Sequence, residues 1–178
     1  MRATFVSYIA LGSNLGDRLG FLQAGLDGLD RSPNLHIIRV SSVFESPAHV
    51  LAGQKPLPDY LNAVLECETS LPPIDLLDLC LSIESSLGRI RENEQRWAAR
   101  TLDLDVIVYG DQTIHSTRLI LPHPRLDQRL FVLLPLAEIA PNLILPAPFN
   151  QSVRYLLETC SDHSEALVSD HVLTMPGV

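Results

Sequence analysis

Six segments with a regular hydrophobic pattern occupy the first 110 residues, and their order limits the folds that this chain can adopt. Segments 4–11, 36–44, 60–69 and 101–109 are rich in β-branched and apolar residues and predict strands. Leucines at helical spacing predict a helix over residues 15–30, and a second apolar stripe predicts another between the prolines at 72 and 73 and Gly88. The order β-α-β-β-α-β predicts the α+β class with a ferredoxin-like core, an antiparallel sheet with helices packed on it.

The chain beyond residue 110 adds smaller pieces to this core. Gly110 and Asp111 can turn the last strand into a hairpin, prolines punctuate short helical pieces over residues 119–140, and residues 152–160 predict a last short helix. Residues 161–178 show little periodicity and are expected to form a loosely ordered tail. With 178 residues and no interdomain linker, the chain is expected to form a single domain over residues 1–160, followed by that tail.

The composition favours a globular protein and excludes several classes of function. Hydrophobic residues make up 46% and charged residues 19%, and the net charge of -8 argues against a nucleic-acid-binding protein, which usually carries a basic face. The three cysteines lack C-x-x-C spacing and indicate small core side chains rather than a disulfide framework or a zinc site. No segment reaches the ~20 apolar residues that span a bilayer, and the N-terminus does not resemble a secretory or transit signal. A cytoplasmic protein without a membrane partner is therefore expected.

Two aspartates in the fourth predicted strand are the sharpest chemical signal. Side chains alternate along a strand, so Asp103 and Asp105 face one side while Leu102, Leu104 and Val106 face the other. Two carboxylates side by side repel each other and lose water, which favours a cation between them. Oxygen ligands without neighbouring His or Cys favour magnesium, and such a pair can hold two ions ~4 Å apart for phosphoryl transfer. The simpler interpretation is the polar outer face of an edge strand.

Arginines gather around this strand. Lys55 is the only lysine, and the other twelve basic residues are arginines. Seven arginines lie between positions 89 and 129, namely Arg89, Arg91, Arg96, Arg100, Arg118, Arg125 and Arg129. The planar guanidinium group suits phosphate oxygens better than an ammonium group does, so the cluster favours binding of a small polyanion. A solvated charged loop, helped by Glu92 and Glu94, is the alternative.

The usual nucleotide-binding and catalytic motifs are absent from the sequence. It contains neither G-x-x-x-x-G-K-[ST] nor G-x-G-x-x-G, and no Ser-His-Asp or Cys-His set is evident from local spacing. The turn formed by Gly12, Ser13 and Asn14 after the first strand could offer backbone N–H groups to an anion, although such a turn is not specific. His123 lies between two prolines and precedes two arginines, but a surface histidine is the simpler interpretation.

Five segments in a fixed order resemble a known family. Residues 96–106, RWAARTLDLDV, resemble the signature of the hydroxymethyldihydropterin pyrophosphokinases, which typically reads R-W-G-P-R-T-L-D-L-D. The other four segments are YIALGSNLGD (8–17), SSVFESPA (41–48), PDYLNAV (58–64) and LPHPRLDQRLFVLLPLAEIAP (121–141). The resemblance spans residues 8–146, most of the chain. Ala98 and Ala99 replace the usual Gly-Pro pair and favour helix in this loop, which is still expected to close because Trp97 and Arg100 keep their spacing.

The resemblance implies roles for individual side chains. Asp103 and Asp105 match the family's magnesium ligands, and Arg89 and Arg100 match its catalytic arginines, at the two ends of a mobile loop. The positions that contact ATP are matched by Glu84, Arg91, Trp97, Arg100, Arg118, His123 and Arg129. The pterin-binding positions are matched by Ser46, Pro47, Tyr60, Asn62, Trp97 and Phe131.

The implied reaction is the transfer of pyrophosphate from ATP to the hydroxymethyl group of 6-hydroxymethyl-7,8-dihydropterin, which gives AMP and the pterin diphosphate during folate synthesis. Tyr60 and Phe131 would stack on the flat pterin, and Asn62 would bind its hydrogen-bonding edge. The expected ligands are ATP, the pterin and two magnesium ions, and a monomer is expected.

Two other classes of function remain. A ferredoxin-like ligand-binding module is one, although no RNP1 run for RNA is present, and a metal-dependent phosphohydrolase is the other, although it leaves the three pterin residues without a purpose.

Overall fold

An antiparallel sheet is the central element of the computed structural model, which describes residues 3–48, 57–89 and 99–177. Within these residues the sheet has six strands: β1 (Phe5–Ser13), β2 (Leu35–Val40), β3 (Phe44–Ser46), β4 (Tyr60–Thr69), β5 (Asp103–Tyr109) and β8 (Leu167–Val168). Their order is β5-β1-β4-β3-β8, and β2 also pairs with β4. A small separate sheet joins β6 (Ile114–His115) to β7 (Ile120–Leu121).

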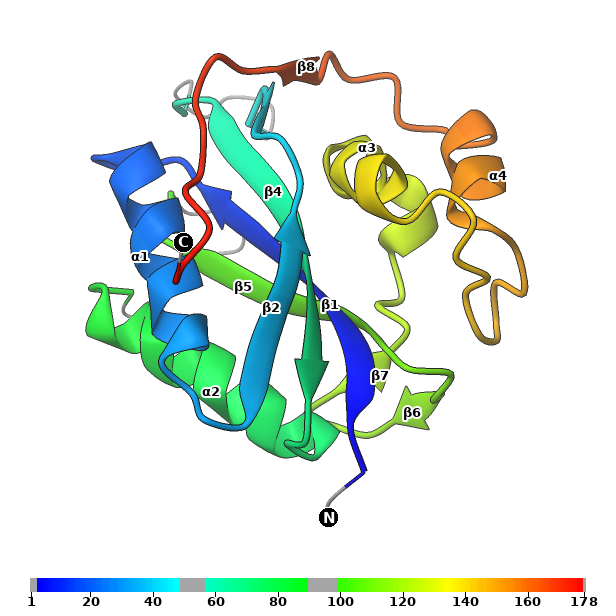
Figure 1. Cartoon of the computed structure of the whole chain (residues 1–178). Coiled ribbons are helices and arrows are strands. Elements are labelled where there is room, and N and C mark those ends of the chain that lie inside the picture. Colours follow the sequence, from blue (N-terminus) through cyan, green and yellow to red (C-terminus); the bar gives the residue numbers. More distant parts are fainter. Residues whose placement is uncertain (1–2, 49–56, 90–98, 178) are drawn as a thin grey trace.

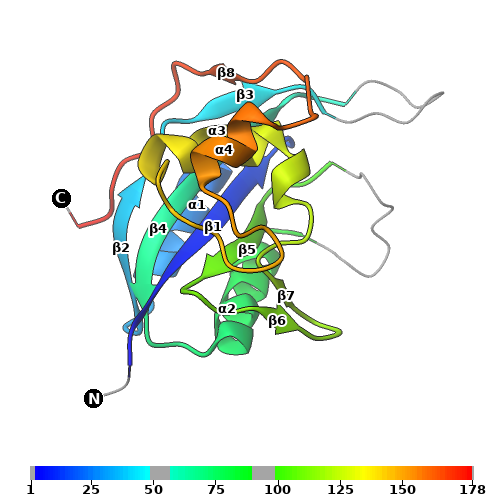
Figure 2. The same cartoon turned by 90° about the vertical axis from the view of Figure 1, so that its right-hand side faces the viewer.

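Helices cover both faces of the sheet (Figures 1 and 2). The first pair, α1 (Arg18–Asp30) and α2 (Pro73–Ser86), packs on one face. On the other face lie α3 (Leu130–Ile139), which follows a short 3-10 turn (Leu126–Gln128), and α4 (Val153–Glu158). The observed order of elements and the antiparallel pairing confirm the predicted α+β, ferredoxin-like class. None of the described helices is both long enough and apolar enough to cross a membrane.

Two hydrophobic cores lie on opposite faces of the sheet because strand side chains alternate. From β1, Ile9 and Leu11 enter the core shared with α1 and α2, while Tyr8 and Ala10 pack on the side of α3 and α4. The central strand β4 is buried along almost its whole length because helices cover both of its faces. This arrangement places the end of the sheet that carries the carboxylates of β5 beside the start of α3.

Two glycines let α1 lie close to its neighbours. A Cβ atom at Gly25 would come within 2.9 Å of the side chain of Leu102, which is fully buried. A Cβ atom at Gly28 would come within 3.1 Å of Ile83 on α2. Because glycine has no side chain, α1 can lie close to α2 and to Leu102, the residue that precedes β5.

The structure differs from the sequence prediction in some element boundaries. The strand expected over residues 36–44 is two strands, because the chain leaves β2 after Val40 and resumes pairing at Phe44. Between them, the hydroxyl group of Ser41 accepts a hydrogen bond from Val64 N at 3.0 Å. The fourth strand begins at Asp103 rather than at residue 101. Helix α3 continues through Pro135, although this residue has no N–H to donate.

Candidate active site

A pocket lies where β1, β4 and β5 face the start of α3. Its empty volume is about 760 Å³, including the open mouth, which suits a small-molecule ligand. Its walls are formed by Ala10, Leu11, Gly12, Ser46, Pro47, Leu57, Tyr60, Asn62, Ala63, Arg100, Asp103, Asp105, Arg129, Phe131 and Val132. The pocket therefore has one side lined by apolar and aromatic residues and another lined by the charged residues Arg100, Asp103, Asp105 and Arg129.

Five of the residues assigned to the pterin from the sequence line this pocket together. Tyr60 opens β4, while Phe131 lies in the first turn of α3. The amide of Asn62 donates to the hydroxyl oxygen of Ser46 at 2.9 Å, and both side chains are buried. Pro47 follows directly after β3 and completes this wall. Two aromatic rings and a fixed amide thus border one space.

The two aspartates of β5 lie on the face predicted for them. Asp103 and Asp105 line the pocket, whereas Leu104 and Val106 enter the core on the opposite face. The side chain of Asp105 is 41% exposed because it faces the pocket. Desolvation by the surrounding walls, together with the charge of Asp103, raises the pKa of Asp105 to about 6. This pair of carboxylates therefore favours a nearby cation.

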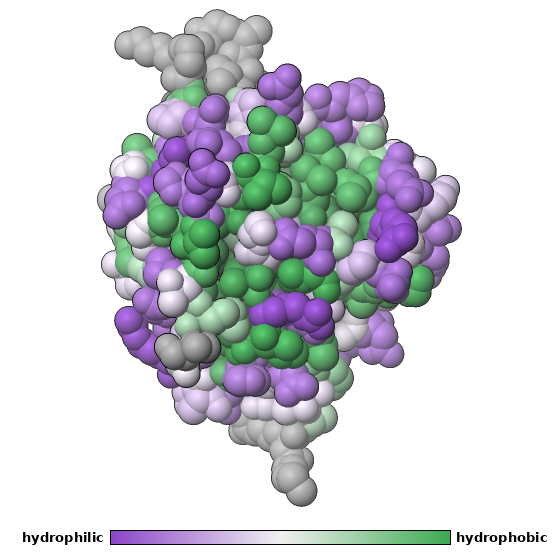
Figure 3. Space-filling model, turned by 45° about the horizontal axis from the view of Figure 1, so that its top comes forward, coloured by the Kyte–Doolittle hydropathy of each residue, from purple (hydrophilic) through white to green (hydrophobic). Residues whose placement is uncertain are grey.

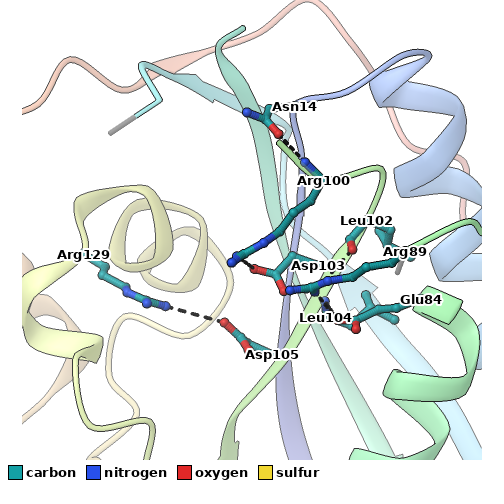
Figure 4. Close-up of polar contacts among 9 residues, drawn as sticks. All are labelled: Asn14, Glu84, Arg89, Arg100, Leu102, Asp103, Leu104, Asp105 and Arg129. Atoms are coloured by element: carbon teal, nitrogen blue, oxygen red, sulfur yellow. Dashed lines mark hydrogen bonds and ion pairs between the residues drawn. The ribbon is translucent and has the colours of Figure 1, made fainter. Parts of the chain in front are cut away.

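Two arginines bracket Asp103 (Figure 4). Arg100 Nη1 lies 2.9 Å from Asp103 Oδ2, and Arg89 forms an ion pair with the other carboxylate oxygen. The side chain of Arg89 is only 5% exposed and also pairs with Glu84 Oε1 at 2.9 Å. The same Glu84 oxygen accepts a hydrogen bond from Leu104 N at 2.7 Å. Glu84 thus fixes Arg89 and β5 together from behind the pocket, rather than lining it.

A third arginine holds the other aspartate. Arg129 Nη1 lies 3.5 Å from Asp105 Oδ2, and its guanidinium carbon lies 5.7 Å from the centre of the Phe131 ring. Arg129 is therefore placed between the charged and aromatic parts of the pocket.

Asn14 supports the site from outside the pocket, through contacts that the sequence did not predict. It is fully buried, and its side-chain oxygen accepts from Arg100 N at 2.7 Å while its amide group donates to Pro58 O at 3.2 Å. Its backbone N–H donates to Arg100 O at 3.1 Å, so this group does not serve an anion in the way considered for the turn after β1. A polar residue directly after an apolar strand is the signal that pointed to this position. Asn14 thus joins Pro58, two residues before β4, to the backbone of Arg100.

The described residues fit a magnesium site completed by a substrate. They contain no group of three or more His, Cys, Asp or Glu side chains able to hold a metal ion. Magnesium is often bound by one or two carboxylates together with substrate phosphates and water, and Asp103 and Asp105 offer two such carboxylates at the pocket.

The remaining predicted residues lie outside the pocket wall. Arg118 pairs with Asp78 on α2, and both side chains are exposed. His123 donates its backbone N–H to Ile107 O at 2.9 Å. Burial, and then the charges of Arg129 and Arg125, lower the pKa of His123 to about 4, so its side chain is neutral at pH 7. The predicted residues Arg91 and Trp97, and the departure at Ala98, lie outside the described part of the chain.

Comparisons with known proteins point to one family. Residues 8–141 match the family 7,8-dihydro-6-hydroxymethylpterin-pyrophosphokinase (HPPK). A Haemophilus influenzae protein named 2-amino-4-hydroxy-6-hydroxymethyldihydropteridine pyrophosphokinase is 41% identical over 157 residues, which cover 88% of this chain and 94% of the relative. A Bacillus subtilis protein of the same name is 43% identical over 134 residues, 75% of this chain and 77% of the relative.

Solved structures agree with this match at the level of the fold. The crystal structure of wild-type Plasmodium falciparum HPPK-DHPS with SDX-DHP superposes with a TM-score of 0.68 at 15% identity. The match covers 89% of this chain but only 45% of that longer one. The comparisons confirm the resemblance stated from the sequence and do not support a pure ligand-binding module or a phosphohydrolase. This chain belongs to the 7,8-dihydro-6-hydroxymethylpterin-pyrophosphokinase family.

Proposed function

We propose that this protein transfers the pyrophosphate group of ATP to the hydroxymethyl group of 6-hydroxymethyl-7,8-dihydropterin, a step of tetrahydrofolate biosynthesis. The pterin oxygen forms a bond to the β-phosphorus of ATP. The bond from that phosphorus to the oxygen shared with the α-phosphate breaks, so AMP leaves and the hydroxyl proton is released. We also propose that the protein acts as a monomer in the cytoplasm.

The observation that carries this proposal is the meeting of two sets of side chains in one pocket. Tyr60, Asn62 and Phe131 offer two rings and an amide, which match a flat heterocycle with a hydrogen-bonding edge. Asp103 and Arg100 lie on the same wall and match a polyphosphate with its metal ions. The acceptor and donor substrates would therefore meet at the border between these sets.

The catalytic contribution of the protein is alignment and charge stabilisation. Arg100 has its backbone fixed by Asn14, so its guanidinium group can reach the transferred phosphates from a defined position. Arg89 enters the same region with its orientation fixed by Glu84. Arg129, beside Phe131, would bind phosphate oxygens next to the stacked pterin.

We propose that Asp103 and Asp105 are the protein ligands of magnesium at this site. Two magnesium ions are proposed. When bound, magnesium would neutralise charge on the phosphate oxygens. Arg91, Arg118 and His123 are proposed nucleotide contacts, and Trp97 is a proposed contact for both substrates.

The test is product identity. The purified protein is incubated with Mg-ATP and the pterin alcohol, and nucleotides are separated chromatographically, with Asp105→Asn as a matched variant and a reaction without pterin as control. We expect AMP and the pterin diphosphate in equal amounts, only when the pterin is present. Formation of ADP, or of phosphate alone, would reject the proposal.

A further inference from the structure

The C-terminal segment 161–177 is attached to the rest of the molecule at three places. From α4 it crosses above α3, runs beside β3 and ends next to α1 (Figures 1 and 2). Near its end, Leu173 is 7% exposed and packs in the core beneath α1. The side chain of Gln23 on α1 donates to Thr174 O at 3.0 Å and accepts from Thr174 N at 2.9 Å. The segment is therefore fixed at its far end.

Its first attachment is to the start of α3. Arg129, the N-cap residue of α3, does not cap the helix with its own side chain, and the first turn contains no acidic residue. Asp162 supplies this cap, because its Oδ2 accepts from Leu130 N at 3.0 Å, while its Oδ1 accepts from Ser164 N at 2.9 Å. The turn that Asp162 caps carries Phe131, which forms one wall of the pocket.

Its second attachment is to β3, at a different wall of the pocket. Strand β8 pairs antiparallel with β3, and Ser169 N donates to Val43 O at 2.8 Å. Strand β3 ends at Ser46, whose hydroxyl group accepts the hydrogen bond from Asn62. Since β3 is only three residues long and has β4 on its other side, β8 covers the edge that would otherwise be unpaired.

We propose that residues 161–177 form a strap that fixes the α3 wall relative to the β3 wall, and that Asp162 is a positioning residue for binding of the pterin. This inference rests on the assignment of the pocket to the pterin made above. The strap holds both walls of the acceptor pocket, whereas Asp103 and Arg100 on the remaining wall are held by Arg89 and Asn14. Loss of the strap should therefore weaken binding of the pterin more than binding of ATP. The strap lies outside the family match, which ends at residue 141.

Several side chains of the strap remain on the surface, so backbone hydrogen bonds contribute to its attachment. Figure 3 brings the side with β8 forward and shows hydrophobic surface among hydrophilic residues there. Leu167 and Val168 are exposed, so β8 is joined to β3 mainly by its ladder hydrogen bonds, whereas Leu173 further along enters the core on the side of α1.

The experiment compares full-length point variants by steady-state formation of AMP. Asp162→Ala should raise KM for the pterin about fivefold, the size expected from losing a helix cap, while KM for ATP stays within about twofold. Asp162→Asn keeps an oxygen that can accept from Leu130 N and should restore most of the pterin affinity. Ser169→Pro removes the N–H that donates to Val43 and should also raise KM for the pterin. The control is Asp170→Asn, an exposed acidic residue on the same segment, which should behave as wild type.

The outcomes separate the strap from the pocket assignment. Equal losses for both substrates, or no loss in Asp162→Ala and Ser169→Pro, would overturn the strap. Failure of the Asn variant to recover affinity would overturn capping by Asp162 as its cause. Phe131→Ala is measured in parallel: normal pterin binding in that variant would instead overturn the pocket assignment itself. Thermal unfolding of each variant confirms that the compared chains are folded.

Discussion

Asp103 and Asp105 lie two residues apart on one strand but have different neighbours. Asp103 is in contact with two arginines, one of them almost fully buried, whereas Asp105 has Arg129 at 3.5 Å and faces the pocket. Asp103 therefore has a structural partner as well as its proposed place at the metal. Asp105 keeps a raised pKa despite Arg129, because of desolvation and the charge of Asp103, so a further cation would stabilise its carboxylate.

This difference predicts how the two alanine variants behave. Asp103→Ala and Asp105→Ala should each lower the rate of AMP formation by more than ~100-fold, because metal-borne stabilisation of the phosphates is lost. Only Asp103→Ala should also destabilise the fold, by ~1–3 kcal/mol, because it removes a partner of buried Arg89. Steady-state rates in magnesium and urea unfolding measure the two effects. Near-normal turnover in either variant would remove that aspartate from the metal site.

At the scale of elements, Glu84 joins α2 to β5. Glu84→Ala should lower the free energy of unfolding by ~3 kcal/mol, because it removes the acceptor of Leu104 N and leaves Arg89 short of a buried partner. Glu84→Gln keeps the acceptor oxygen and should cost less than half as much. Denaturant unfolding measures both, with Glu68→Ala on the exposed part of β4 as control. Equal costs for Ala and Gln would mean that the backbone hydrogen bond contributes nothing.

The rings and the amide proposed to bind the pterin come from β4 and α3, separate from the carboxylates of β5, which predicts a separation of substrate affinities. Tyr60→Ala, Asn62→Ala and Phe131→Ala should weaken pterin binding by about tenfold or more through lost stacking or hydrogen bonding. Affinity for a non-hydrolysable ATP analogue should stay nearly unchanged. Titrating each variant separately with the two ligands is the measurement. Equal losses for both ligands would indicate a damaged fold instead of a substrate contact.

The elements that local patterns describe well are the ones that the sequence predicted. The alternation Leu102-Asp103-Leu104-Asp105 was enough to place two carboxylates on one face, because strand geometry alone decides it. The boundary between β2 and β3 was not predictable in this way. It depends on Ser41, which bonds to Val64 on a neighbouring strand, and no local pattern records that contact.

Site residues divide along the same line. The predicted residues that line the pocket lie in the motif segments, whereas the supporting contacts of Asn14 and Asp162 were not predicted. Asn14 lies 86 residues before Arg100, and Asp162 lies 32 residues after Leu130. Such contacts arise only from the tertiary fold. The tail expected to be loosely ordered pairs with β3 through β8, although its sequence shows little periodicity.

At the scale of the whole molecule, charge is distributed unevenly. The chain carries a net charge of -8, yet Arg100 and Arg129 line the pocket and Arg89 lies directly behind Asp103. The average charge of the protein therefore repels a triphosphate, whereas the arginines at this pocket would attract it. Local fields within a cleft decide such binding more than net charge does, and the attraction falls with ionic strength.

The glycines of α1 limit how this protein can be stabilised by engineering. Replacing a helical glycine with alanine usually gains ~1 kcal/mol, which makes such positions the first choice for raising thermal stability. Gly25→Ala should do the opposite, because its methyl group would displace Leu102 and with it the adjacent Asp103. We expect a lower melting temperature and slower AMP formation, both partly recovered by adding Leu102→Val, which makes room.

If Gly25→Ala alone raised the melting temperature at full activity, the helix would not be in contact with the start of β5 in the way described. If the prediction holds, the active site at one end of the sheet requires that Gly25, a weak helix former, stays in α1 on the opposite face of the sheet. Random screens for heat resistance should then fail to recover larger residues at Gly25 and Gly28.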